Sequence, residues 1–162
     1  MEGVVQHDHW TEEHLARLDV HETFADAVTH GIEMLTELRK FGLVNQICGP
    51  MTTGGLGTLE ANMDLFAYAV KMARERSYVT FNQIPFQKVI IRITDHHRGG
   101  PYNMGILTNF YGPLFQSGLV QQLLFLPGWE SSTGACKERE FAQEYGIPVM
   151  EYPEPWLRTR AA

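Results

Sequence analysis

The chain has 162 residues, of which 44% are hydrophobic, 20% charged and 11% aromatic. This length and composition predict one globular domain with its own core and argue against a disordered or collagen-like chain. The 19 acidic and 13 basic residues give a net charge of −6, which disfavours nonspecific attraction to a nucleic-acid backbone or an anionic membrane.

The cysteines and the hydropathy of the chain further narrow the class of protein. Cys48 and Cys136 are far apart in the sequence and give no sign of a disulfide framework. No segment approaches the roughly 20 apolar residues of a membrane-spanning helix. The start of the chain, MEGVVQHDHW, has neither the basic nor the apolar region of a secretion signal. We therefore expect a soluble, cytoplasmic protein without nucleic-acid or membrane partners.

The first half of the chain predicts helices, one strand and a glycine-rich loop. Residues 11–40 place apolar side chains three and four positions apart, which indicates helix, with a break expected near residues 19–23. The apolar run LVNQICG at 43–49 is typical of a short buried strand. A glycine-rich loop at 52–58 and an amphipathic helix at 59–76 complete half of a βαβ unit.

The second half continues the alternation. We predict strands at 78–84, 88–93, 119–128 and 147–152, helices at 105–116 and 134–146, a polar turn at 94–103 and a loosely packed tail from residue 153. Such alternation favours a parallel, doubly wound sheet, in which ligands bind beyond the carboxyl ends of the strands. The loops after Cys48 and after Leu126 both fall at those ends.

Two segments carry a resemblance to a known family. They are ICGPMTTGGLGTLEANMDLF at 47–66 and LFLPGWESSTGACKEREFAQEYGIPV at 124–149, and the second contains the pattern Ser132-x-Gly134-x-x-x-Glu138. Together they resemble the nucleoside 2-deoxyribosyltransferase-like superfamily, near small members with a Leu-Pro-Gly-Trp-Glu turn and related to the 2′-deoxynucleoside 5′-phosphate N-hydrolases. The resemblance covers about residues 44–152.

The resemblance implies a flavodoxin-like, doubly wound parallel sheet of about five strands. Residues 44–152 would form this core, and residues 1–40 would add one or more N-terminal helices to the same single domain. Members of the family often form homodimers or larger homo-oligomers that complete one another's sites. No metal or other cofactor is implied.

The resemblance also implies a chemistry. Family members cleave an N-glycosidic bond through a glutamate that attacks C1′ of the sugar, which corresponds here to Glu138. A serine at the start of the pattern, here Ser132, binds phosphate in members that act on nucleoside 5′-monophosphates. An aspartate assists near the base, and Asp95 is the candidate because no other aspartate follows Asp64.

The start of the helix predicted at 134–146 favours a bound anion independently of the resemblance, because free N–H groups at a helix N-terminus attract negative charge. Glycines in the nearby loops let the backbone approach a ligand closely. The resemblance implies that the ligand is a nucleoside or nucleotide. The expected binding residues are Gly49, Pro50, Met51, Gly54, Gly55, Trp129, Glu130, Ser131, Ser132, Thr133 and Gly134.

The candidate site residues could instead have purely structural roles. Glu138 could be a solvated helix carboxylate, Ser132 and Thr133 could only cap a helix, and Trp129 could pack over its turn to close the core. The glycines of residues 54–57 could form a flexible connection. The histidine-rich N-terminus, including His14 and His21, is interpreted as surface histidines.

Other functional hypotheses stay open. A nucleotide-binding sensor or assembly protein without turnover is the main alternative, because many relatives have an aspartate where this chain has Gln121 and Gln122. A structural domain that oligomerises through its N-terminal helices is a third. The sequence Asp95-His96-His97 invites a metal interpretation but lacks a partner carboxylate at ligand spacing.

Overall fold

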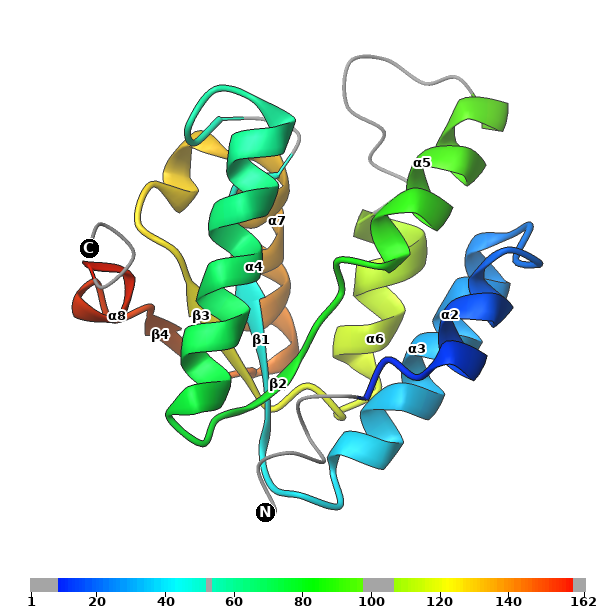
Figure 1. Cartoon of the computed structure of the whole chain (residues 1–162), viewed down its shortest axis with the longest axis horizontal. Coiled ribbons are helices and arrows are strands. Elements are labelled where there is room, and N and C mark those ends of the chain that lie inside the picture. Colours follow the sequence, from blue (N-terminus) through cyan, green and yellow to red (C-terminus); the bar gives the residue numbers. More distant parts are fainter. Residues whose placement is uncertain (1–8, 52–53, 98–106, 159–162) are drawn as a thin grey trace.

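The computed structural model describes residues 9–51, 54–97 and 107–158 (Figure 1). Within these ranges, the side chains of residues 88, 91, 94–97, 107 and 108 lie outside the description.

The described part of the chain contains one sheet of four parallel strands in the order β2-β1-β3-β4. The strands are β1 (Val44–Cys48), β2 (Val79–Phe81), β3 (Gln122–Phe125) and β4 (Val149–Glu151). Strand β1 is central, because Gln46 is in register with Phe81 on one side and Leu123 on the other. The predicted α/β class with a parallel sheet is confirmed, with four strands in place of about five.

Helices connect the strands and cover both faces of the sheet, with α4 in front of it and α7 behind it in Figure 1. The α-helices are α2 (Glu12–Leu18), α3 (Phe24–Leu38), α4 (Leu59–Glu75), α5 (Phe86–His97), α6 (Gly112–Gln116), α7 (Thr133–Tyr145) and α8 (Pro155–Arg158). Two shorter turns are the π-helix η1 (Leu107–Tyr111) and the 3-10 helix η2 (Trp129–Ser131).

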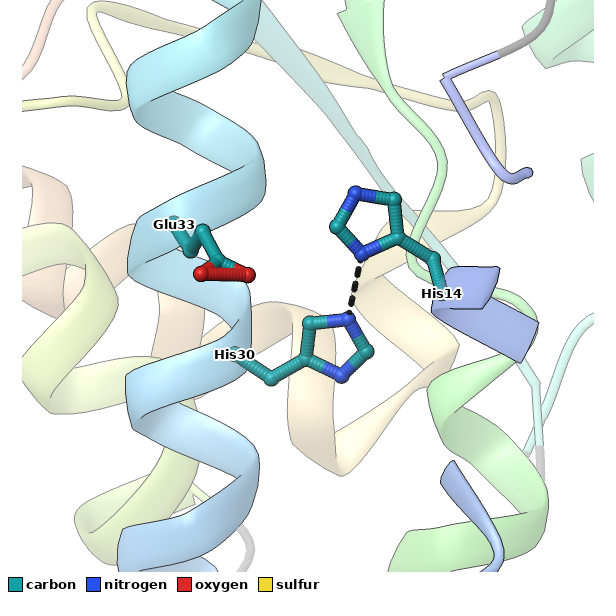
Figure 2. A group of neighbouring side chains, drawn as sticks. All are labelled: His14, His30 and Glu33. Carbon is teal, nitrogen blue, oxygen red and sulfur yellow. Dashed lines mark hydrogen bonds between the residues drawn. The ribbon is translucent and has the colours of Figure 1, made fainter. Parts of the chain in front are cut away.

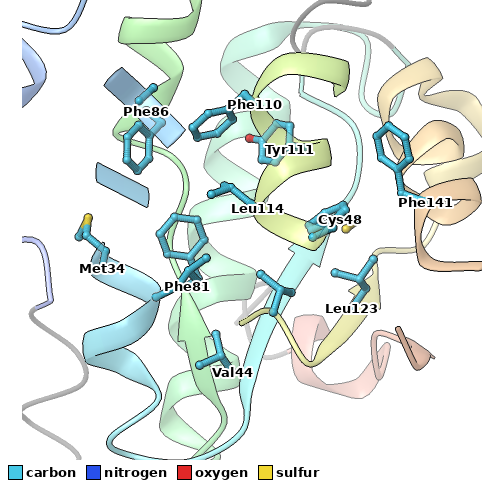
Figure 3. Close-up of a cluster of buried hydrophobic side chains, with 14 of the residues drawn as sticks. Met34, Val44, Cys48, Phe81, Phe86, Phe110, Tyr111, Leu114, Leu123 and Phe141 are labelled. Carbon is cyan, nitrogen blue, oxygen red and sulfur yellow. The ribbon is translucent and has the colours of Figure 1, made fainter. Parts of the chain in front are cut away.

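The strands bury apolar side chains on both faces. Ile47 and Leu124 point to one face and pack in a cluster with Phe66 of α4. Cys48 and Leu123 point to the other face and join a larger cluster that contains side chains of α3, α5, α6 and α7 (Figure 3). Because neighbouring strand residues point to opposite faces, strands buried on both sides are apolar without alternation. The arrangement is consistent with a doubly wound fold.

The strand predicted at 88–93 is wrong, since these residues lie in α5. The reason is the period of the apolar side chains. The buried positions of α5 are Phe86, Val89, Ile90 and Ile93. Spacings of three and four residues place them on one helical face, and Pro85 directly before the helix suits its start. The turn predicted from residue 94 is therefore also corrected, because residues 94–97 continue α5.

The tail is more ordered than the sequence predicted. Residues 155–158 form α8, and the Trp156 ring lies edge-on to the rings of Tyr78 and Tyr152, with centroids 5.2 Å and 5.3 Å away. The guanidinium of Arg76 lies over the same indole at 5.1 Å. One large aromatic side chain therefore anchors α8 against the α4 face of the sheet.

The N-terminal helices end and restart where the sequence predicted a break. Thr11 caps α2 by accepting from the His14 N–H, and Thr23 forms a capping box with Asp26 at the start of α3. A second N-cap interrupts the apolar period and starts a new helix. Leu18 of α2 and Leu35 of α3 belong to the same buried cluster as the strand residues, so both helices contribute to the sheet's core.

The interpretation of the N-terminal histidines as surface residues is wrong. His14, His21 and His30 are buried and form a hydrogen-bonded chain. Burial, with a contribution from the positive charge of Arg17, lowers the pKa of His30 to about 4, so its ring is neutral near pH 7. Burial also lowers the pKa of His21. A neutral imidazole can donate through one nitrogen and accept through the other, which satisfies it inside a core.

If α3 shares one core with the sheet, Leu35→Ala should lower the free energy of unfolding of the whole domain by about 2–5 kcal/mol, because it removes a fully buried side chain. Urea denaturation followed by circular dichroism and by tryptophan fluorescence measures this loss. The control Val20→Ala, at a side chain that is 72% exposed, should change stability by no more than about 0.5 kcal/mol. Two separate transitions would show that the N-terminal helices unfold on their own.

Candidate functional site

The order of the strands points to the carboxyl ends of β1 and β3 as a candidate binding region. The chain passes from β1 to β2 on one side, and later returns to place β3 on the other side of β1. In doubly wound sheets, ligands bind beyond the carboxyl ends of the strands at such a reversal. The loops after β1 and β3 are the two that the sequence singled out.

The structure brings these two loops into contact. The N–H of Gly55 donates to Oγ of Ser131 at 2.8 Å, and the Ser131 hydroxyl donates to the carbonyl oxygen of Gly128 at 2.7 Å. Gly54 has a φ of +68°, and a Cβ there would lie 2.2 Å from the carbonyl oxygen of Ser131. Gly54 therefore permits a close approach of two backbones, which a flexible connection would not require.

Asn62 at the start of α4 holds the first loop in shape. Its side-chain amide donates to the carbonyl oxygens of Met51 and Gly54 at 3.0 Å and 3.1 Å, and its Oδ1 accepts from the Leu56 N–H at 2.8 Å. Asn62 was not among the expected site residues. One feature of the sequence could have indicated its role. Asn62 lies one helical turn before Phe66, so a polar side chain falls on the buried apolar face of α4.

Residues before the loop are tightly packed. Gly49 and Pro50 are buried, and a Cβ on Gly49 would lie 2.7 Å from Cδ1 of Leu126. A Cβ on Gly55 would lie 2.6 Å from Cβ of Pro50. Met51 is partly buried against the α4 cluster. The ends of β1 and β3 can therefore lie side by side here only because Gly49 has no side chain.

Ser132 caps α7, as the structural alternative proposed. Its Oγ accepts from the Ala135 N–H at 3.1 Å, and the residue is only 3% exposed. A hydroxyl that accepts through oxygen keeps its own proton for donation, so capping leaves a donor for a ligand. Thr133 is exposed and Gly134 is half-buried in the first turn of the same helix.

Trp129 packs over its turn, as in the structural alternative, and its ring contacts other side chains of the protein. Its ring lies edge-on to Phe125 at 5.4 Å, and the guanidinium of Arg139 lies 4.5 Å from its centroid. Glu130 is exposed, and its carbonyl oxygen accepts from the Cys136 thiol at 3.5 Å. Of these two predicted ligand residues, Glu130 is exposed and Trp129 is partly buried.

Glu138 lies in the second turn of α7 and is 6% exposed, so it is not a solvated helix carboxylate. Desolvation raises the pKa of Glu138 to about 8, and a hydrogen bond with the Cys48 thiol opposes that rise. Burial, followed by the charge of Glu138, raises the pKa of Cys48, which therefore stays a thiol. Cys48 ends β1 directly before Gly49, so the Glu138 carboxyl sits beneath the loops.

Cys48 was not among the expected site residues. It stands in an apolar run, where a cysteine normally acts as a small hydrophobe. Its thiol and the Glu138 carboxyl are two groups that could ligate a metal, but no third ligand joins them among the residues that the structure describes.

Asp95 lies in the last turn of α5, and its side chain is outside the described residues. Its role as an acid therefore stays a prediction. A cavity of about 510 Å³ is lined in another region by Leu15, Met63 and Val89, from α2, α4 and α5. None of the expected ligand residues lines it.

Comparison of the sequence with models of protein families and with curated proteins finds no match, and the fold matches no solved structure. Among the described helices, none has the length and apolar character needed to cross a membrane. The site must therefore be judged on its own geometry.

Asn62→Ala should destabilise the protein by about 1–3 kcal/mol, because it leaves the Leu56 N–H and two carbonyl oxygens without their partner. Hydrogen exchange should show faster exchange at the Leu56 amide. Asp64→Ala, an exposed position of the same helix, is the matched control. Unchanged protection at Leu56 in the Asn62 variant would contradict the role given to this side chain.

The pKa of Glu138 predicts a pH-dependent difference in stability. A carboxyl whose folded pKa is raised from 4.5 to about 8 stabilises the fold below pH 4.5, and this contribution is lost as the pH rises through about 8. Glu138→Gln stays neutral, so its stability relative to wild type should increase between pH 5 and pH 8, by up to about 1.4 kcal/mol per pH unit. Parallel denaturation curves across this range measure the difference.

The exposed residue Glu140 provides the matched control. Glu140→Gln should keep the wild-type pH profile. A constant difference between wild type and Glu138→Gln across the range would show that Glu138 is ionised in the folded protein.

Proposed function

We propose that the protein binds a nucleoside or nucleoside 5′-monophosphate at the carboxyl ends of β1 and β3, and that it cleaves or exchanges the N-glycosidic bond through Glu138. The main support is the contact of the Gly54–Gly55 loop with Ser131 at the point where the strand order reverses, above the buried Glu138 carboxyl. The strand order matches the first four strands of the flavodoxin-like order 2-1-3-4-5. The family resemblance of residues 44–152 supports the same conclusion.

The phosphate or sugar would bind at the start of α7. The first N–H groups of this helix carry the positive end of its dipole, and the hydroxyls of Ser132 and Thr133 lie in the same turn. Because the cap uses Ser132 as an acceptor, its proton can be donated to a phosphate oxygen. Gly54 and Gly55 would bring backbone close to the sugar.

The reaction needs Glu138 in its ionised form. The carboxylate attacks C1′, the bond from C1′ to the base nitrogen breaks, and the base leaves with a proton from an acid, for which Asp95 is the candidate. Water or a second base then attacks C1′ and releases the carboxylate. Since burial keeps Glu138 protonated near neutral pH, turnover should increase as the pH rises toward about 8.

The burial of Glu138 also favours the alternative, a nucleotide-binding protein without turnover. A neutral carboxyl hydrogen-bonded to a thiol is a poor nucleophile. In addition, Gln121 accepts from the Val44 N–H at 3.2 Å, so a position that is acidic in many relatives serves to hold the sheet here. A cytoplasmic location and a homo-oligomer remain expectations under both functions.

A thermal-shift screen against nucleosides, deoxynucleosides and their 5′-monophosphates tests both functions, because a ligand of the folded state raises the melting temperature. Each ligand found is then incubated with the protein at pH 7 and pH 8.5, and released base is measured by chromatography. The first function predicts base release that is faster at pH 8.5 and abolished in Glu138→Gln. Glu140→Gln should retain it.

The outcomes separate the hypotheses. Binding without base release in wild type would support the nucleotide-binding alternative. Base release that persists in Glu138→Gln would refute the role of Glu138. Absence of a shift with any of these ligands would refute both.

A further inference from the structure

Two histidine rings from different helices face each other inside the N-terminal region. Nδ1 of His14, on α2, lies 2.8 Å from Nε2 of His30, on α3 (Figure 2). Glu33 lies one turn further along α3, and one possible ligand atom from each of the three residues lies within 4.8 Å of the others. The three side chains converge on one small volume, although they come from two helices.

The outer nitrogens of both rings have partners of their own. Nε2 of His14 lies 3.4 Å from Oε1 of Glu37, and Nδ1 of His30 lies 2.9 Å from Nε2 of His21. Histidines that bind metals usually donate their second N–H to such a carboxylate or other acceptor, which fixes the ring and directs the remaining lone pair at the metal.

These outer hydrogen bonds have a consequence for the inner nitrogens. If His14 donates to Glu37 and His30 donates to His21, both nitrogens of the 2.8 Å pair carry lone pairs. Two lone pairs at that distance repel each other unless a cation lies between them. That cation is a shared proton or a metal ion.

We propose that His14, His30 and Glu33 form a binding site for a divalent transition-metal ion such as Zn²⁺, with Glu37 and His21 orienting the two imidazoles. Two imidazole nitrogens and one carboxylate oxygen suit zinc and its neighbours, whereas Mg²⁺ and Ca²⁺ prefer oxygen ligands. Three protein ligands leave a fourth tetrahedral position for water.

A bound metal ion requires shifts of the ligand atoms, which lie within 4.8 Å of one another. Two ligands about 2.0–2.1 Å from a tetrahedral ion lie about 3.3 Å apart, so the histidine nitrogens must separate by about half an ångström. Arg17 forms an ion pair with Oε2 of Glu33, and the carboxylate has a second oxygen that can ligate. Arg17 is a third exposed and can remain as an outer partner of the carboxylate.

The surroundings would hold such an ion firmly. The rings of Trp10 and Phe86 lie edge-on to His30, with centroids 5.8 Å and 5.5 Å away. Apolar walls limit access of water and strengthen the attraction between cation and ligands. The ion would link α2 to α3 across the break between them and thereby stabilise the N-terminal helices.

Metal titration of the full chain tests the proposal. Protein freed of metal by dialysis against a chelator is titrated with Co²⁺, whose visible absorption reports tetrahedral coordination, and Zn²⁺ is then added in competition. We expect saturation at one equivalent, displacement by Zn²⁺, and a rise in melting temperature with Zn²⁺. Circular dichroism confirms the fold of each variant.

Matched variants identify the ligands. Glu33→Gln, at a half-exposed position, and His14→Ala should each weaken binding at least about tenfold, and Glu37→Gln by about 10–100-fold. Glu13→Gln on α2 and the double variant His96→Ala/His97→Ala should bind as wild type does. Absence of saturable binding would overturn the proposal. So would binding that survives both Glu33→Gln and His14→Ala, because it would locate the ion at other histidines.

Discussion

The burial of β1 is the constraint on which the rest of the structure depends. All of its residues, Val44–Cys48, are buried, and it is hydrogen-bonded to β2 on one side and β3 on the other. One of its polar side chains also bonds to a neighbouring strand, since the Asn45 amide donates to the Val79 carbonyl oxygen at 3.1 Å. Gln83, from the segment after β2, donates to the Ile47 carbonyl oxygen at 2.9 Å. The end of this strand fixes where both loops of the candidate site can lie.

The same burial determines the chemistry available at the site. The thiol of Cys48, at the end of β1, meets the Glu138 carboxyl of α7 where water is excluded, so Glu138 is held as a neutral acid and Cys48 as a thiol. A carboxylate that must ionise before it attacks would link catalysis to the entry of a ligand or to pH. The close approach of Gly54 to Ser131 joins the two loops next to the pair formed by Cys48 and Glu138.

The N-terminal helices are held in place by both polar and apolar contacts. Their buried polar groups are paired with one another, as in the chain from His14 through His30 to His21, and apolar residues such as Leu35 join them to the sheet's core. His14 and His21 do not share one helical face, since α2 ends at Leu18 and His21 lies before α3. Their seven-residue spacing in the sequence predicts such a face. It gave no sign that His30, from the following helix, would fill the space between them.

The sequence by itself determined the alternation of helices and strands, the break between α2 and α3, and the position of both glycine-bearing loops at strand ends. These features depend on local period, caps and turn residues. The helical period of α5 was also present in the sequence, but an apolar run this short was interpreted as a strand. Only the tertiary structure decided the pairing of Cys48 with Glu138 and of His14 with His30. Desolvation and contact depend on residues that are distant in the chain and meet only when the sheet and its helices pack.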